Sequence, residues 1–167
     1  NADFDILEGG VQVIIVVEDE VPFYSSLLPQ IYHEVTSQTS RLMAEGLNLS
    51  HRLLRIRARP KILLATTYEE AVEKVKLYQE SLLCLISDVR FSRKGNMDEN
   101  AGFSLVQEAR GMIKGLPTVI QSSDIKNSRR AFELKSTFIN KNSDTLLQDI
   151  RNFIMHHLGF GNFVYRD

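Results

Sequence analysis

The sequence predicts an α/β domain in which helices cover both faces of a doubly wound, five-stranded parallel sheet. Five short apolar runs of strand character alternate with five segments of helical character, and this alternation is typical of parallel strands joined by crossover helices. The chain has 167 residues, enough for one domain with a substantial core. Four of the apolar runs end in carboxylate, hydroxyl or ammonium side chains, which places a polar site at one edge of the sheet.

The first strand is expected over residues 11–17, which are almost entirely aliphatic. The helix that follows has one apolar face with a spacing of four residues, formed by Phe23, Leu27, Ile31 and Val35. Pro29 interrupts this pattern and is expected to kink the helix. Gly46 is expected to end it.

The segment between the first and second strands is longer than one crossover helix requires, so residues 36–59 are predicted to form a helical insertion. The first helix would extend into it, and a short second helix would cover residues 49–56. Apolar side chains are frequent in the insertion, namely Leu42, Met43, Leu47, Leu49, Leu53, Leu54 and Ile56. A free loop would not carry them, so burial against a partner is expected, either a second copy of the chain or a downstream region. The alternative is that the insertion folds back onto its own domain.

The rest of the chain repeats the strand–helix unit. The four further strands are expected at residues 61–65, 82–88, 117–121 and 137–140, and the helices between them at residues 68–78, 103–112 and 124–134. Thr67 is the expected cap of the first of these helices. Residues 92–100 are expected to be a long polar loop. Ser143 and Asp144 are the expected caps of a last helix, whose apolar face is formed by Leu146, Leu147, Ile150, Phe153, Ile154 and Leu158.

Composition excludes several classes of partner and location. The net charge of −1 gives no reason to expect nucleic acid or an anionic membrane as a partner. Cys84 is the only cysteine and lies in an apolar strand, so it is expected to be a reduced core residue. Without a membrane span or a signal peptide in the sequence, the expected location is cytoplasmic. Residues 1–10 are expected to be a tag remnant with a flexible N-terminus, and residues 159–167 the start of a linker.

The carboxylates at the strand ends indicate a cation site. Glu18 and Asp19 follow the first strand, and Asp88 ends the third. The carboxyl ends of parallel strands meet at one edge of the sheet, so these groups would repel one another unless a cation lay among them. A small set of oxygen ligands suits Mg²⁺, which is often shared with a phosphoryl group. Each residue alone is more often an ordinary loop or cap residue, and the prediction depends on their joint occurrence.

In the order and placement of these residues, positions 11–158 resemble response-regulator receiver domains, a CheY-like family with a flavodoxin-like (βα)₅ fold. The resemblance implies that Asp88 is the phosphoacceptor. It also implies that Mg²⁺ is bound directly by Asp19 and Asp88, by the backbone carbonyl of Arg90, and mostly through water by Glu18. Arg90 departs from the usual pattern, because its long cationic side chain can reach a phosphoryl group or screen it from water.

The resemblance extends to the later strands. Ser122 matches the hydroxyl residue that contacts the phosphoryl group, and Lys141 matches the lysine that pairs with its oxygens. Phe138 matches the aromatic switch residue, and Gly102 matches the glycine that precedes the third helix. Asn142 departs from the family, because a proline usually follows the lysine.

These matches imply a phosphoacceptor module of bacterial two-component signal transduction rather than a classical enzyme. The donor would be a histidine kinase or a phosphotransfer protein, and phosphorylation would change a surface formed by the fourth helix, fifth strand and fifth helix. The departures leave an alternative, an unphosphorylated receiver-like domain for interaction or dimerisation that regulates an attached enzyme region. A phosphohydrolase or a flavin site is disfavoured, because residues 18–20 lack the Asp-x-Asp pattern and no phosphate loop follows them.

A narrower resemblance concerns three stretches, residues 23–29, 57–64 and 158–164. They look like receivers joined to phosphoenolpyruvate synthase or pyruvate phosphate dikinase-like regions in bacteria. This resemblance implies that a downstream effector region of the same chain is a further partner.

Overall fold

The computed structural model describes residues 11–45 and 60–157, with side chains up to residue 37 in the first range. The expected tag remnant, the second helix of the insertion and the linker lie outside these residues. Within the described part, no helix combines the length and the apolar character needed to cross a membrane.

Five strands form one parallel sheet in the order β2-β1-β3-β6-β7. Their bounds are β1 Val13–Val17, β2 Lys61–Ala65, β3 Leu82–Asp88, β6 Thr118–Ser122 and β7 Thr137–Asn140. From β1 the chain runs to β2 at one edge of the sheet, and it then crosses over β1 to form β3 on the other side. The winding direction therefore reverses between β1 and β3. The prediction of a doubly wound, five-stranded parallel sheet is therefore confirmed.

The strand register aligns the polar strand ends. Val17 is the partner of Ser87, so the residues that follow β1 lie beside Asp88 at the end of β3. Asp88 is in turn the partner of Gln121, and Ser122 is the partner of Asn140. The carboxyl ends of four strands thus meet within one or two residues of one another.

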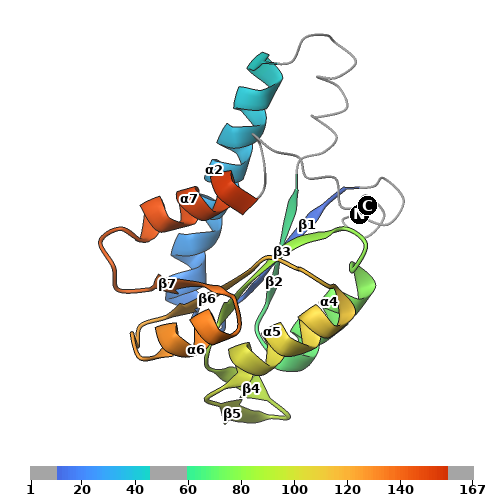
Figure 1. The fold of residues 1–167 in the computed structure, drawn as a ribbon, viewed down its shortest axis with the longest axis vertical. Coiled ribbons are helices and arrows are strands. Elements are labelled where there is room, and N and C mark those ends of the chain that lie inside the picture. The colour runs from blue at the N-terminus through green and yellow to red at the C-terminus, as the bar shows by residue number, and fades with distance from the viewer. Residues whose placement is uncertain (1–10, 46–59, 158–167) are drawn as a thin grey trace.

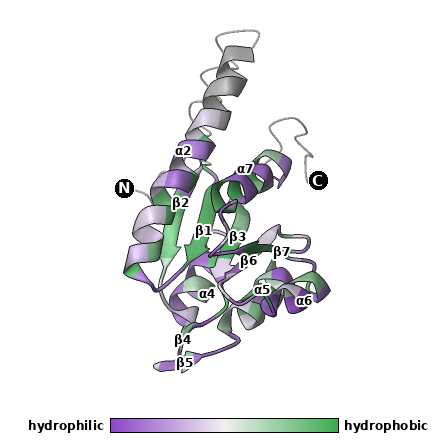
Figure 2. Cartoon of the chain, turned by 90° about the vertical axis from the view of Figure 1, so that its left-hand side faces the viewer, coloured by the Kyte–Doolittle hydropathy of each residue, from purple (hydrophilic) through white to green (hydrophobic). Residues whose placement is uncertain are grey.

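Helices cover both faces of the sheet, so the domain has three layers, with the sheet in the middle (Figure 1). Their bounds are α2 Val21–Glu45, α4 Tyr68–Leu77, α5 Ala101–Met112, α6 Asn127–Glu133 and α7 Leu146–His157. Alternate β1 residues face opposite layers, because Ile14 and Val16 pack with α2 and α7 while Val13, Ile15 and Val17 pack with α4 and α5. The most hydrophobic part of the chain is accordingly the sheet between the helices (Figure 2). Cys84, as expected, is a buried free thiol.

The first helix, α2, extends past Pro29 to Glu45 without a break, so it enters the predicted insertion. The expected apolar face is present, with Leu27, Ile31 and Val35 buried against the sheet. On α7, Ile150, Phe153 and Ile154 are buried as expected. Leu147 was expected on the same face but is 49% exposed, because it lies on the side of α7 that faces away from the sheet.

The segment expected to be a polar loop contains an antiparallel hairpin, β4 Phe91–Arg93 and β5 Asn96–Asp98. Its turn consists of Lys94 and Gly95, with φ angles of 54° and 78°. Positive φ at both central residues is what a two-residue hairpin turn of this kind requires. The hairpin is anchored by Phe91, whose side chain is fully buried.

The hairpin also contacts α4. The guanidinium of Arg93 lies 4.1 Å from the ring centroid of Tyr68, and the backbone N–H of Lys94 donates a 2.6 Å hydrogen bond to Glu69. These contacts place the end of the hairpin beside the carboxyl edge of the sheet.

Candidate functional site

A depression of about 410 Å³ lies at the carboxyl edge of the sheet. Residues from several strand ends and from the hairpin line it, namely Asp19, Glu20, Asp88, Val89, Arg90, Met97, Glu99, Ser122, Ser123, Asp124, Asn127 and Lys141. Most of the polar residues singled out in the sequence therefore lie at one site.

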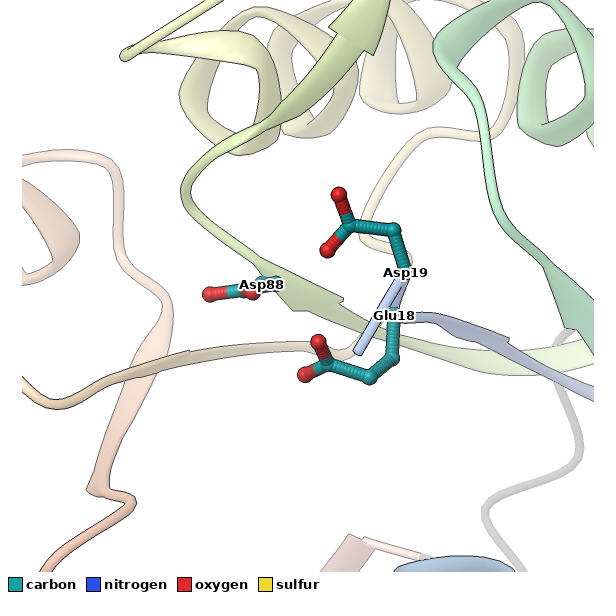
Figure 3. Close-up of side chains that lie close together, drawn as sticks. All are labelled: Glu18, Asp19 and Asp88. Atoms are coloured by element: carbon teal, nitrogen blue, oxygen red, sulfur yellow. The ribbon is translucent and has the colours of Figure 1, made fainter. Parts of the chain in front are cut away.

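Three carboxylates form the acidic part of this site. Glu18, Asp19 and Asp88 each offer an oxygen within 4.8 Å of the others, and Figure 3 shows Glu18 and Asp19 extending from the end of β1 beside Asp88 at the end of β3. Burial, with the charge of Asp88, raises the pKa of Glu18 to about 7. Burial also raises the pKa of Asp19. Loss of solvent around the carboxylates is the main physical cause of both pKa shifts, and the like charge of Asp88 adds to it.

Lys141 is the cation of the site. Its Nζ lies 2.6 Å from Glu18 Oε2 and 2.9 Å from Asp88 Oδ2, and its side chain is only 8% exposed. Burial alone would lower the pKa of Lys141, but the hydrogen bonds to Glu18 and Asp88 raise it above its ordinary value. The backbone N–H of Lys141 donates to the carbonyl of Ser122, which fixes the root of the side chain at the end of β6.

Gln121 holds Glu18 in place and was not identified from the sequence. Its buried side-chain amide donates a 3.2 Å hydrogen bond to Glu18 Oε2, and the backbone N–H of Glu20 donates to Oε1 at 3.1 Å. A polar residue at an otherwise apolar position of a buried strand is the signal that could have pointed to Gln121, because such a side chain needs a partner.

Asp88 is held from two sides. The backbone N–H of Val89 donates to Oδ1 at 2.8 Å, while Lys141 donates to Oδ2. The side chain is 11% exposed, so the carboxylate is mostly buried yet still lines the depression. Such a group is available to a ligand and is already oriented.

Ser122 lines the same depression as Asp19 and Asp88. Its Oγ accepts hydrogen bonds from the backbone N–H of Asp124 at 3.0 Å and from the side-chain amide of Asn127 at 2.9 Å. A hydroxyl has two acceptor positions and one donor, so these bonds leave the Ser122 proton for a ligand. Asn127 was missed in the sequence, where only its place in a polar segment could be read.

Arg90 lies at the rim of the site. Its guanidinium Nε is 2.8 Å from the Glu99 carboxylate, and both side chains are mostly exposed.

Phe138 is separate from the depression, because it is half-buried on β7 and packs on the core beneath α4 and α5. The structure thus brings together all of the expected site side chains except Phe138, with Glu18 buried just below the lined surface.

Gly102 is required by the approach of α5 to the end of β3. A Cβ atom at this position would lie 2.0 Å from the backbone oxygen of Asp88, a distance that no side chain tolerates. Its N–H donates to the carbonyl of Val89. Gly102 therefore lets α5 pack directly against the backbone that presents Asp88.

The donor set fits a hard divalent cation. Glu18, Asp19 and Asp88 supply oxygen atoms, and no cysteine or histidine stands among the residues that line the depression. Mg²⁺ prefers oxygen ligands and keeps several waters. A cation here would also offset the repulsion among the carboxylates, which adds to burial in raising the pKa values of Glu18 and Asp19.

No family model matches the chain, and no curated protein matches it. Among solved structures it is similar to the phosphorylated cyanobacterial phytochrome response regulator RcpA, with a TM-score of 0.56 and 15% identity over 89% of this chain and 95% of that one. A response regulator receiver domain protein from Clostridium thermocellum gives 0.53 and 17%, over 86% and 94%. Vibrio cholerae chemotaxis protein CheY4 gives 0.53 and 13%, over 88% and 98%. The chain therefore has the flavodoxin-like receiver fold.

Proposed function

We propose that the chain is a phosphoacceptor receiver module of two-component signal transduction and that Asp88 accepts the phosphoryl group. The observation that carries this proposal is the position of Asp88, a carboxylate at a strand end that is hydrogen-bonded to Lys141 and grouped with Glu18 and Asp19. The receiver fold supports it. On this view the chain is a regulatory module that assists its own phosphorylation and dephosphorylation rather than a classical enzyme.

In the proposed step, an Asp88 oxygen attacks the phosphorus of a phosphohistidine. The new O–P bond forms as the P–N bond breaks, and the bond electrons leave with the imidazole nitrogen, which takes a proton from solvent. The product is an acyl phosphate on Asp88. When bound, Mg²⁺ would neutralise charge on the transferring oxygens, and Asp19, Asp88 and the Arg90 carbonyl would hold it, with Glu18 acting through water.

Lys141 and Ser122 are the proposed readers of the product. The ammonium of Lys141 would exchange a carboxylate partner for a phosphoryl oxygen, and the Ser122 hydroxyl would donate its unused proton. Both residues lie next to β6 and β7, so their movement would alter the surface of α6, β7 and α7, with Phe138 as the proposed switch residue on β7.

Phosphorylation tests the proposal directly. With acetyl phosphate or phosphoramidate and Mg²⁺, intact-mass spectrometry should show one added phosphoryl group that hydroxylamine removes. Asp88→Asn should abolish the addition, whereas Asp124→Asn should retain it because Asp124 is an exposed carboxylate of the same depression. Labelling of Asp88→Asn at the wild-type level would mean that another residue is the acceptor. Absence of labelling in the wild type, together with no beryllofluoride binding, would favour an unphosphorylated interaction domain.

Titration with Mg²⁺ tests the metal site separately. Isothermal calorimetry should show one weak site in the wild type, and Asp19→Asn should weaken it at least tenfold by removing a direct ligand. Glu20→Gln is the matched control, because it removes the same charge from the next residue. Equal loss in both variants would mean that general charge, rather than ligation by Asp19, determines binding.

The proposed partners follow from the same module. A histidine kinase or phosphotransfer protein would donate the phosphoryl group, and a downstream region of the phosphoenolpyruvate synthase type would receive the signal. The latter depends on sequence stretches that lie partly outside the described residues. The full-length gene would decide it, and sedimentation of the isolated chain would decide whether the chain forms a homodimer.

A further inference from the structure

Lys141 has an aromatic neighbour in addition to its two carboxylates. Its Nζ lies 4.4 Å from the ring centroid of Phe23, above the ring face. Phe23 belongs to the first turn of α2, which follows the acidic loop at residues 18–20. Its half-buried ring packs on the core between α2 and the sheet. The ring is therefore fixed by the core on one side and faces the ammonium on the other.

We propose that Phe23 is a positioning residue for Lys141, holding the ammonium at the site before and during phosphoryl transfer. This inference rests on the proposed function of Asp88 and names a residue that supports it through Lys141. A lysine has a long, flexible side chain with a compact charge. An aromatic face attracts such a charge, most strongly where water is excluded, and Lys141 is nearly buried here.

The ring suits a lysine that must change partners. Hydrogen bonds to Glu18 and Asp88 fix the ammonium along particular N–H directions. The attraction to a ring face has no single acceptor atom, so the ammonium can turn from a carboxylate toward a phosphoryl oxygen while it remains over Phe23. The ring also keeps water from one side of the ammonium, which strengthens the remaining ion pairs.

Two substitutions separate positioning from packing. Phe23→Leu keeps an apolar side chain against the core but removes the ring face, and Phe23→Tyr keeps the ring. Leu28→Ala is the control for loss of packing alone, because Leu28 lies on the same helix and packs on the same core cluster. All four proteins are compared in the unphosphorylated state by NMR and in the presence of Mg²⁺ by titration with beryllofluoride.

In the unphosphorylated protein, the ε-methylene protons of Lys141 should be shifted upfield by the ring current in the wild type, Phe23→Tyr and Leu28→Ala, and not in Phe23→Leu. Beryllofluoride affinity should fall about tenfold in Phe23→Leu alone, the loss expected from one partly desolvated cation–π contact. Absence of the upfield shift in the wild type would overturn the contact itself. An upfield shift lost in Phe23→Leu without weaker beryllofluoride binding, or an equal weakening in Leu28→Ala, would overturn the positioning role.

The two proposals fail in different ways. If the wild type shows the ring-current shift but binds no beryllofluoride, the proposed phosphoacceptor function fails and the positioning role falls with it, while the Phe23–Lys141 contact stands. If the wild type binds beryllofluoride and Phe23→Leu binds it equally well, the phosphoacceptor function stands and only the role of Phe23 is wrong.

Discussion

Glu18 shows how closely the residues of this site depend on one another. It is a carboxylate with no solvent exposure, and a buried charge is stable only when it is paired and hydrogen-bonded. Lys141 supplies the charge, while Gln121 and the backbone of Glu20 supply the hydrogen bonds. Removal of Lys141 would leave Glu18 and Asp88 facing each other, so this lysine has a structural role in addition to the proposed reading of the phosphoryl group.

The close approach of α5 to β3 at Gly102 allows a prediction about the addition of a single Cβ atom. Gly102→Ala should lower the free energy of unfolding by about 1–3 kcal/mol or more, because the new Cβ meets backbone rather than a movable side chain. It should also slow phosphorylation, since the obstructed backbone is that of Asp88. Urea unfolding and acetyl phosphate labelling would measure the two effects.

Gly111→Ala is the matched control on the same helix, α5. A Cβ at Gly111 meets nothing within 4 Å, and alanine favours helix over glycine by up to about 1 kcal/mol. Gly111→Ala should therefore be neutral or stabilising. If the two variants unfold at the same urea concentration, the close approach at Gly102 does not limit stability.

Among single residues, the sequence predicted that the charged side chains at the strand ends lie at one site, because Glu18, Asp19, Asp88 and Lys141 stand at the ends of recognisable apolar runs. Gln121, Asn127 and Phe23 could not be assigned in this way. Each acts on a neighbour that is distant in the chain or specified only by the fold, such as Glu18 across the sheet from Gln121. Hydrogen-bond partners of this kind depend on the register, which the sequence alone does not define.

At the scale of elements, α5 is tied to the turn after α6 by Arg110. The guanidinium donates to Thr118 Oγ1 at 2.8 Å, to the Lys135 carbonyl at 2.7 Å and to the Leu134 carbonyl. Burial lowers the pKa of Arg110 below its ordinary value. These carbonyls end α6, where Lys135 has a left-handed φ of 55°, so Arg110 satisfies backbone groups that the helix leaves unpaired.

Arg110→Met should consequently destabilise the chain by about 2–4 kcal/mol, because it keeps the apolar stem and removes several charge-assisted hydrogen bonds. Hydrogen exchange should accelerate most in α6 and β7 and least in α2. Arg129→Met on α6 is the control, since Arg129 is 89% exposed and forms an ion pair with Glu133 across one turn; it should change stability by less than about 0.5 kcal/mol. A uniform acceleration of exchange in Arg110→Met would contradict a local link between α5 and α6.

Within residues 11–45 and 60–157 the elements themselves were largely predictable, since apolar periodicity identified the five strands of the parallel sheet and the five helices found there. The hairpin β4–β5 was not, because most of its residues are polar and its strands contain three residues each. Strands this short have too little alternation to be recognised. They are held by contacts with α4, such as that of Arg93 with Tyr68, and these contacts exist only in the folded chain.

At the scale of the whole molecule, one topological feature explains why chemistry gathers where it does. The reversal of winding between β1 and β3 leaves no helix over their carboxyl ends, and ligands bind at such a point in open α/β sheets. The neighbouring strands β6 and β7 then carry Ser122 and Lys141 to the same edge. α6 and α7 pack on opposite faces of the sheet beside β7, so a change at the site has a short route to the surface.

The last prediction concerns that route. In Lys141→Ala, phosphorylation or beryllofluoride binding should no longer change hydrogen exchange in α6, β7 and α7, because the charge that moves toward the phosphoryl group is gone. Lys141→Arg should restore part of the change. Since Lys141→Ala also leaves Glu18 and Asp88 without their cation, its thermal stability should be reduced without Mg²⁺ and should recover more on Mg²⁺ addition than that of the wild type. A phosphorylated Lys141→Ala protein with the full wild-type exchange response would show that another residue transmits the signal, and Ser122, the other polar group that links β6 to the site, would be the next to test.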